Sequence, residues 1–336
     1  MILHPGILAL LLASIIILLM LLHAAGLGLR IVRGWDYASS SEGQLTLERQ
    51  AYLVSTLVFY AFGFVMLSGF LYLYTVDEIH NLFIGAMCAV GSLNANPIGW
   101  QVLGSKIVTF FLAAVWMAVN FIDQRGEDYP LVKIKSLFLL LIVPVVVFDL
   151  YAQGRYFLGL QPEIITSCCG SLFTDQGSAV AGEVAGLPVK PMMWLFYLVV
   201  LLHTGTGILC LRTGAAMARY LFAALSLVFF LVALAAIISY ISLYIYELPT
   251  HHCPFDILQK EYHFIGYPMY ISLFTGVAFG LFPGIMQPAK KFASLDNEIR
   301  RAERKWVVLS MAGIIGFALI SSWPVWSGNL TMQGYF

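Results

Sequence analysis

Charged side chains are scarce in this chain. Only 11% of its 336 residues are Asp, Glu, Lys or Arg, whereas about a quarter is usual in soluble domains. Apolar residues make up 60% and are gathered into long uninterrupted runs. This composition excludes a soluble enzyme, a nucleic-acid binder, a disordered chain and a small disulfide-knotted secreted module. It indicates an integral membrane protein.

Several sequence motifs with known chemistry are absent too. The chain has no Gly-x-x-x-x-Gly-Lys phosphate loop, no dinucleotide fingerprint and no His-Glu-x-x-His zinc motif. It also lacks Cys-x-x-Cys-His, which excludes a covalently attached c-type haem, and it lacks the paired Cys-x-x-Cys of thiol oxidoreductases. Function must therefore be argued from individual residues and from their side of the membrane.

Long uncharged runs predict an all-α bundle of about eight transmembrane helices in one integral membrane domain. A helix needs about 20 apolar residues to cross a bilayer core. The expected spans lie near 7–29, 51–74, 105–123, 136–155, 192–211, 220–246, 264–286 and 306–326. The third is long enough only if Lys106 reaches the membrane interface, and the fourth only if Asp149 is accepted inside it.

Lysine and arginine residues predict the orientation of these spans. Fourteen of the eighteen fall in the connections on one side, while the acidic residues divide evenly between the two sides. Because basic residues are enriched on the cytoplasmic side, both termini are expected to be extracytoplasmic. The outer loops would then be 75–105, 151–190 and 247–263. We expect a multi-pass protein of the bacterial inner membrane with its working face outside.

A short similarity suggests an internal repeat. Residues 71–74, Leu-Tyr-Leu-Tyr, followed by His80, resemble residues 243–246, Leu-Tyr-Ile-Tyr, followed by His252. Four expected spans separate the two copies, so the repeat would be a parallel four-plus-four duplication. The alternative is that these tyrosines belong to an ordinary aromatic belt at the membrane interface.

Cysteines are concentrated on the expected outer face. Four of the five, Cys88, Cys168, Cys169 and Cys253, fall in outer loops. These four allow two structural disulfides, a metal site or a thiol relay in the oxidising periplasm. In a relay Cys253 would attack first, Cys168 or Cys169 would resolve, and Cys88 would lie nearest the membrane. The vicinal pair is expected to face other partners, because neighbouring cysteines rarely bridge each other.

The residues Cys253-Pro254-Phe255-Asp256 resemble the start of a helix. Proline favours the first helical position, which would make Cys253 the N-cap and Asp256 the third helical residue. A thiol at that position would be stabilised as a thiolate by the helix dipole. The alternative is a plain helix cap with a structural disulfide.

Histidines provide two further candidate sites. His80, His251 and His252 lie on the outer face, where together with Asp149 they form a candidate site for a soft metal or another cation. His23 and His203 lie inside expected spans and are the only candidate pair for a b-type haem. Their expected depths differ by roughly 8 Å, so this haem site is disfavoured.

These features lead to three functional hypotheses. The first is thiol–disulfide or metal-linked electron transfer at the outer face, coupled to a quinone or to another membrane or periplasmic protein. The second is an anchoring subunit of a larger respiratory-type membrane complex, with structural disulfides. The third is a cation or small-solute transporter. The expected partners are the lipid bilayer and other proteins, and no nucleic acid is expected.

Overall fold

The computed structural model describes residues 3–37, 39, 41–126, 128–161, 165–166, 180–328 and 330. In this part of the chain eight helices are long and apolar enough to cross a membrane. Apart from one isolated bridge, the described residues form no β-structure. The predicted all-α fold with eight spans is therefore confirmed, and it indicates a multi-pass membrane protein.

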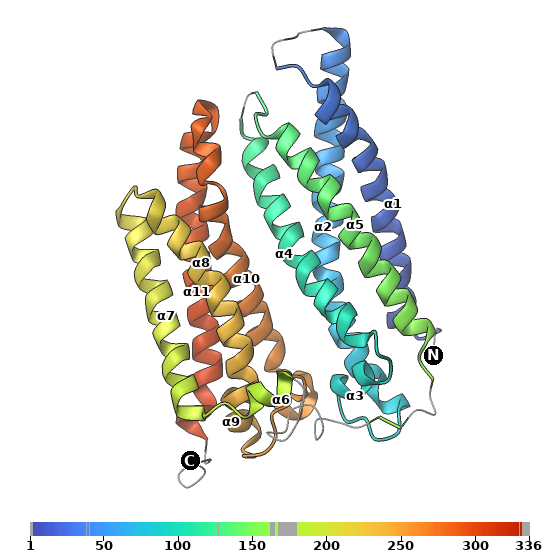
Figure 1. Ribbon diagram of the computed structural model, residues 1–336, viewed down its shortest axis with the longest axis vertical. Helices are drawn as coiled ribbons and strands as arrows, with labels where there is room; N and C mark the ends of the chain where they lie inside the picture. The colour runs from blue at the N-terminus through green and yellow to red at the C-terminus, as the bar shows by residue number, and fades with distance from the viewer. Residues whose placement is uncertain are drawn as a thin grey trace. The chain divides into compact units, whose positions relative to one another are not determined.

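The chain separates into two compact units, and each contains four long helices (Figure 1). Unit 1 comprises the described residues of 1–76, 93–164 and 288–300, and unit 2 those of 77–92, 165–287 and 301–336. The long helices of unit 1 are α1 (Pro5–Gly34), α2 (Glu42–Glu78), α4 (Gly99–Asp123) and α5 (Val132–Leu158). Those of unit 2 are α7 (Val189–Arg212), α8 (Ala216–Ala236), α10 (Gly266–Ile285) and most of α11 (Ala293–Ser327).

The remaining elements are short, and most of them lie in the connections between the long helices. They are α3 (Ala89–Asn94), α6 (Val180–Ala185), α9 (Ser242–Tyr246) and the 3₁₀ turns η1 (Ile79–Leu82), η3 (Asp256–Leu258), η4 (Lys260–Tyr262) and η5 (Gln287–Lys291). Helix α8 continues through a π-helical turn, η2 (Ile237–Ile241), into α9. In unit 2 the ends of α9 and α11 and the short α6 lie at the same end of the bundle (Figure 1).

Several helices extend beyond the expected spans because their ends are polar. Helix α2 begins at Glu42, nine residues before its apolar run, and α11 begins at Ala293. Hydropathy marks only the part of a helix that suits lipid, whereas backbone hydrogen bonding continues into the charged ends. In α11 the exposed Arg300 and Asp296 support one such end with an i,i+4 ion pair of 2.9 Å.

The core of unit 1 is built by side chains from all four of its long helices. Leu21 of α1, Phe62 of α2 and Ile142 of α5 are almost completely buried around Trp116 of α4. The rings of Phe62 and Trp116 meet edge to face with centroids 5.2 Å apart. Unit 1 thus has a continuous apolar core of its own.

Two buried ion pairs join α4 to α5 across this unit. Lys106 Nζ lies 2.6 Å from Asp149 Oδ2, and Lys135 Nζ lies 2.7 Å from Asp123 Oδ2. Lys106, which we expected at the membrane interface, is instead buried against Asp149. Pairing is the physical reason: a charge inside the bundle is tolerated when an opposite charge neutralises it.

Unit 2 has an aromatic core and one very close helix contact. Phe196 of α7 packs against Phe229 of α8 and Phe317 of α11, with ring centroids 5.9 and 6.0 Å apart. Helices α10 and α11 touch at Gly276 and Gly313, where a Cβ on Gly313 would lie 2.7 Å from the opposite Cα. Small residues are needed where two helix backbones approach this closely.

Candidate functional site

The first segment of the candidate site is the turn at residues 83–88, between η1 and α3. Gly85 has a φ of +84°, and a Cβ there would lie 2.6 Å from the carbonyl oxygen of Thr166. Beside it the amide of Thr166 donates to Ile84 O at 2.9 Å, in the isolated parallel bridge. Glycine is required because both the backbone angle and the close approach exclude a side chain. The turn leads directly into Cys88.

The second segment is the loop 247–263, between α9 and α10. Two buried tyrosines hold its backbone. Tyr246 Oη donates to Cys253 O at 2.6 Å and accepts from Ile257 N at 3.0 Å. Tyr270 Oη donates to the next carbonyl oxygen of the loop at 2.6 Å. Buried backbone groups need such partners, so the two hydroxyls determine the path of the chain around Cys253.

This loop corrects the helix start that we expected at Cys253. The residues after Cys253 form a bend, and a 3₁₀ turn of only three residues begins at Asp256. Helix α10 itself starts at Gly266. The carbonyl groups that would begin a helix are bound by the tyrosine hydroxyls instead, so Cys253 is not an N-cap and no long helix dipole acts on its thiol.

The two segments bring Cys88 and Cys253 together. Their Sγ atoms lie 3.5 Å apart although 165 residues separate them in sequence, and both side chains are fully buried. This is a contact distance, since a disulfide bond is about 2.05 Å long. Cys253 Sγ donates to Asp256 Oδ1 at 3.2 Å, and the other carboxylate oxygen lies 2.5 Å from His251 Nε2. The amide of Phe255 donates to Cys253 Sγ at 3.4 Å.

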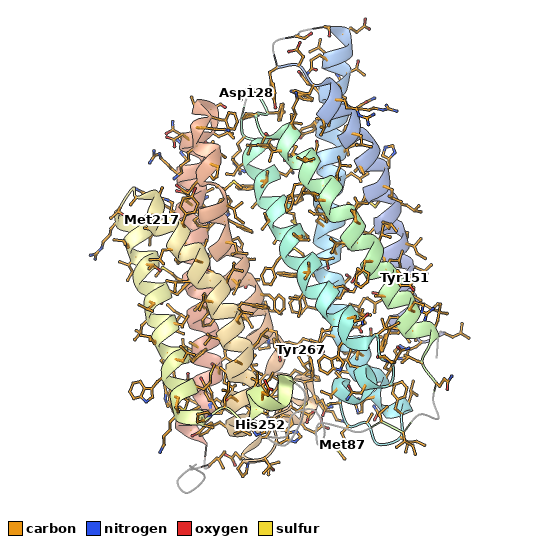
Figure 2. All side chains as sticks on the ribbon, viewed as in Figure 1. Met87, Asp128, Tyr151, Met217, His252 and Tyr267 are labelled. Atoms are coloured by element: carbon orange, nitrogen blue, oxygen red, sulfur yellow. The ribbon has the colours of Figure 1, made fainter. Side chains whose placement is uncertain are left out.

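Polar contacts between the two segments support this arrangement. Gln259 Nε2 donates to the carbonyl oxygen of Met87 at 2.8 Å, one residue before Cys88. On the other side of Cys88, the amide of Ala89 donates to Asp77 Oδ1 at 3.1 Å. Figure 2 labels Met87 and His252 on these connections of unit 2. The sulfur pair is therefore held from both sides by groups outside it.

The site changes from buried to accessible over a short distance. Cys253 is fully buried, the side chain of Asp256 is 12% exposed and that of His251 is 31% exposed. Burial raises the pKa of the nearby Tyr262 phenol above its ordinary value, with further contributions from Asp256 and Cys253. Tyr262 therefore stays neutral, and the carboxylate is the group placed to accept a proton from the thiol.

The cysteine predictions have different outcomes. Cys88 and Cys253 contact each other, whereas the expected relay pairs Cys253 with Cys168 or Cys169, which lie outside the described residues. Cys210 is buried at the C-terminal end of α7, among Ala218, Phe222 and Val307. Among the described residues no two cysteines are joined by a disulfide.

The histidines proposed as metal ligands have separate contacts. His251 contacts Asp256, whereas His252 Nδ1 lies 2.8 Å from Ile238 O in the π-helical turn. His80 Nδ1 contacts the carbonyl oxygen of Asp77 within its own turn. His251 is thus linked to Cys253 through Asp256.

Asp149, the fourth proposed metal ligand, belongs to unit 1. Its two carboxylate oxygens contact Lys106 Nζ at 2.6 Å and Ser105 Oγ at 2.5 Å. His80, His251 and His252 belong to unit 2. A carboxylate with both oxygens engaged in this way is suited to a structural ion pair.

The two candidate haem ligands also belong to different units. His23 of α1 lines a cavity of about 520 Å³ in unit 1, together with Arg30 and Gln50. His203 of α7 is fully buried in unit 2, where its Nε2 lies 3.1 Å from Ser226 Oγ and its ring packs on Phe222. Neither unit by itself contains the predicted pair.

Two contributions to the site were missed in the sequence. The sequence places Asp256 at the third position of an expected helix, whereas in the structure its carboxylate accepts a hydrogen bond from Cys253; the spacing of three residues suits contact within one turn. Tyr246 was interpreted as part of an interfacial belt or a repeat, and its hydroxyl proves to support the cysteine loop. Tyrosine at a helix end is common in membrane proteins, so no sequence signal separated the two roles.

Taken as chemistry, the cluster offers two adjacent thiols, a carboxylate in contact with one of them and an imidazole behind the carboxylate. Such a set can form and break a disulfide, or hold a thiolate-binding metal ion. Comparison of the chain with protein-family models, with curated proteins and with solved structures finds no match in any of the three. Function is therefore inferred from this geometry.

Proposed function

We propose that unit 2 carries a thiol–disulfide redox centre in which Cys88 and Cys253 alternate between a dithiol and a disulfide. The observation that carries the proposal is the 3.5 Å contact between two sulfur atoms from segments far apart in sequence. The sulfurs need to approach by only about 1.5 Å to reach bonding distance.

The position of Asp256 supports different roles for the two cysteines. Its Oδ1 accepts the hydrogen bond of Cys253, so the carboxylate can take up the proton when Cys253 becomes a thiolate. His251 contacts the opposite carboxylate oxygen and is partly exposed, which provides a route for that proton toward solvent. Cys253 is therefore the attacking thiol, and Cys88 is the neighbour placed to resolve.

The reaction is an exchange with a partner disulfide. The Cys253 thiolate attacks one partner sulfur, forms a mixed disulfide and releases the other partner sulfur as a thiolate. Cys88, as a thiolate, then attacks Cys253 Sγ, which forms the Cys88–Cys253 bond and releases the second partner sulfur. Two electrons and two protons pass to the partner in total. A quinone, the alternative acceptor, would take the same number and become a quinol.

The distribution of basic residues supports an extracytoplasmic location. Cys88 and Cys253 lie in two of the expected outer loops, on the side with few lysines and arginines. In bacteria that side faces the periplasm, where disulfides persist. Because both thiols are fully buried, exchange requires the loop 247–263 to open so that the partner disulfide can reach Cys253 Sγ.

The test is to map the cysteines in cells that express the full chain. Thiols are blocked with one alkylating reagent, disulfides are reduced, and the released thiols are labelled with a second reagent before mass spectrometry. We expect both Cys88 and Cys253 to carry the second label, which marks cysteines that were in a disulfide. In the Cys88→Ser variant Cys253 should carry the first label instead, because it has lost its partner.

Cys210 serves as the matched control, because it is also buried in unit 2 but lies away from the site. It should carry the first label in every sample. If Cys88 and Cys253 are never linked, the proposal is wrong. If they are linked but no reductant reverses the bond in the folded protein, the anchoring-subunit hypothesis with structural disulfides replaces it.

A further inference from the structure

We infer that, in the reduced protein, Cys88, Cys253 and Asp256 form a binding site for a Zn²⁺ ion. The inference goes beyond the proposed function, because three ligands can hold an ion whether or not the thiols exchange with a partner. It rests on the proposed function in one respect only: oxidation of the two thiols to a disulfide would remove the thiolate ligands and release the ion.

The ligand atoms have the spacing that a tetrahedral zinc ion requires. One atom from each of the three residues lies within 4.8 Å of the other two. With Zn–S bonds of about 2.3 Å and a Zn–O bond of about 2.1 Å, tetrahedral angles place two sulfurs about 3.8 Å apart, and a sulfur and an oxygen about 3.6 Å apart. The distances found are 3.5 Å between the sulfurs and 3.2 Å from Cys253 Sγ to Asp256 Oδ1. Small outward shifts of the three side chains would accommodate the ion.

The donor types select the class of metal. Two thiolates exclude the hard ions Mg²⁺ and Ca²⁺, which are bound by oxygen ligands. A carboxylate beside the thiolates favours the borderline Zn²⁺ over Cu(I), which prefers sulfur alone. Three protein ligands leave one of four positions for water or for a further ligand.

Two groups that contact the ligand residues, the His251 imidazole and the Phe255 amide, would orient and stabilise them. His251 Nε2 contacts the carboxylate oxygen of Asp256 that does not face Cys253, and so orients the carboxylate. The amide of Phe255 donates to Cys253 Sγ at 3.4 Å, which stabilises negative charge on that sulfur. Both cysteines are fully buried, so an ion bound there would be shielded from bulk solvent. These contacts come from the same loop that carries two of the ligands.

The inference is tested by zinc binding to the full chain in detergent. The protein is reduced without oxygen and incubated with equimolar Zn²⁺, and the bound metal is measured after desalting. We expect about one zinc per chain in the reduced protein and almost none after oxidation. Co²⁺ in place of Zn²⁺ should show absorption bands of thiolate coordination.

Variants identify the ligands. Cys88→Ser, Cys253→Ser and Asp256→Asn should each weaken zinc binding at least tenfold, as judged by competition with a chelator. His251→Gln should weaken it about 10- to 100-fold, since it removes a contact to a ligand. The control Cys210→Ser should bind zinc as the unmodified chain does.

The outcomes separate this inference from the redox proposal. If the reduced chain binds no zinc but its cysteines form a reversible disulfide, the zinc site is refuted and the redox centre stands. If zinc binds and both cysteines resist every oxidant, the redox centre is refuted and the zinc site stands. If Cys210→Ser loses zinc while Cys88→Ser retains it, the ligand assignment is wrong. The comparison of reduced with oxidised unmodified protein remains decisive even where a variant fails to fold.

Discussion

Replacing Lys106 by methionine should destabilise the protein by about 3–5 kcal/mol, because the change leaves the Asp149 carboxylate buried without its counter-ion. The Nζ–Oδ2 distance is 2.6 Å, and the two side chains are 3% and 7% exposed. At an effective dielectric constant of about 20, opposite charges roughly 4 Å apart attract by about 4 kcal/mol. The hydroxyl of Ser105, 2.5 Å from the carboxylate, would remain but could not replace a full charge.

A double-mutant cycle makes the prediction quantitative. Lys106→Met and Asp149→Leu should each destabilise strongly, whereas the double variant should lie within about 1 kcal/mol of the unmodified protein or above it, because it removes both buried charges together. The coupling energy should therefore be several kcal/mol. The assay is reversible unfolding in mixed detergent micelles, with secondary structure followed by circular dichroism.

The exposed pair of Arg300 and Asp296 provides the matched control. Its N–O distance is 2.9 Å, similar to the buried pair, but the side chains are 55% and 33% exposed. Arg300→Ala should cost only about 0.3–0.5 kcal/mol. If Lys106→Met costs no more than this control, or if the coupling energy is below about 1 kcal/mol, the account of the ion pair in unit 1 is refuted.

Two further predictions concern the cysteine loops. Gly85→Ala should cost about 1–3 kcal/mol and lower the yield of the cysteine cross-link, since it strains a left-handed turn and crowds a carbonyl oxygen. The control Gly104→Ala lies inside helix α4 and meets open space, so it should lower neither thermal stability nor cross-linking. An equal loss in both variants would contradict this reasoning. Tyr246→Phe should leave two buried backbone groups without a hydrogen bond, at a cost of about 1–3 kcal/mol each. Hydrogen exchange of the loop 247–263, measured by mass spectrometry, should therefore become faster. Unchanged exchange would show that the hydroxyl does not hold the loop.

The fold could be predicted because its signal is continuous along each helix. A run of about 20 apolar residues predicts a transmembrane helix, whatever packs against that helix. The ends of α2 and α11 could not be predicted in this way, because their charged residues have no hydropathy signal. The ion pair between Lys106 and Asp149 could have been predicted from the spacing of the two residues. Both buried ion pairs that join α4 to α5 are centred near residue 128, where the chain reverses between these helices.

The site could be predicted only in part. Assigning loops to one side of the membrane brought Cys88 and Cys253 into one candidate set, but 165 residues separate them, and nothing local reveals their contact. The contacts of the histidine side chains could not be predicted from the sequence either. His252 contacts Ile238 O because a π-helical turn offers a carbonyl there, and such turns have no clear sequence signature. Which of several nearby imidazoles contacts Asp256 is decided by the backbone path of the loop.

A redox titration resolved by cysteine shows whether Cys88 and Cys253 form a reversible redox pair. The purified full chain is equilibrated with buffers of defined thiol–disulfide potential, quenched by alkylation and mapped by mass spectrometry, with Cys210 as the internal control. We expect alkylation of Cys88 and Cys253 to be lost together as the potential rises, in one two-electron transition between about −270 and −120 mV, as is usual for catalytic pairs. No joint transition at any potential, or one below about −300 mV as in structural disulfides, would contradict it.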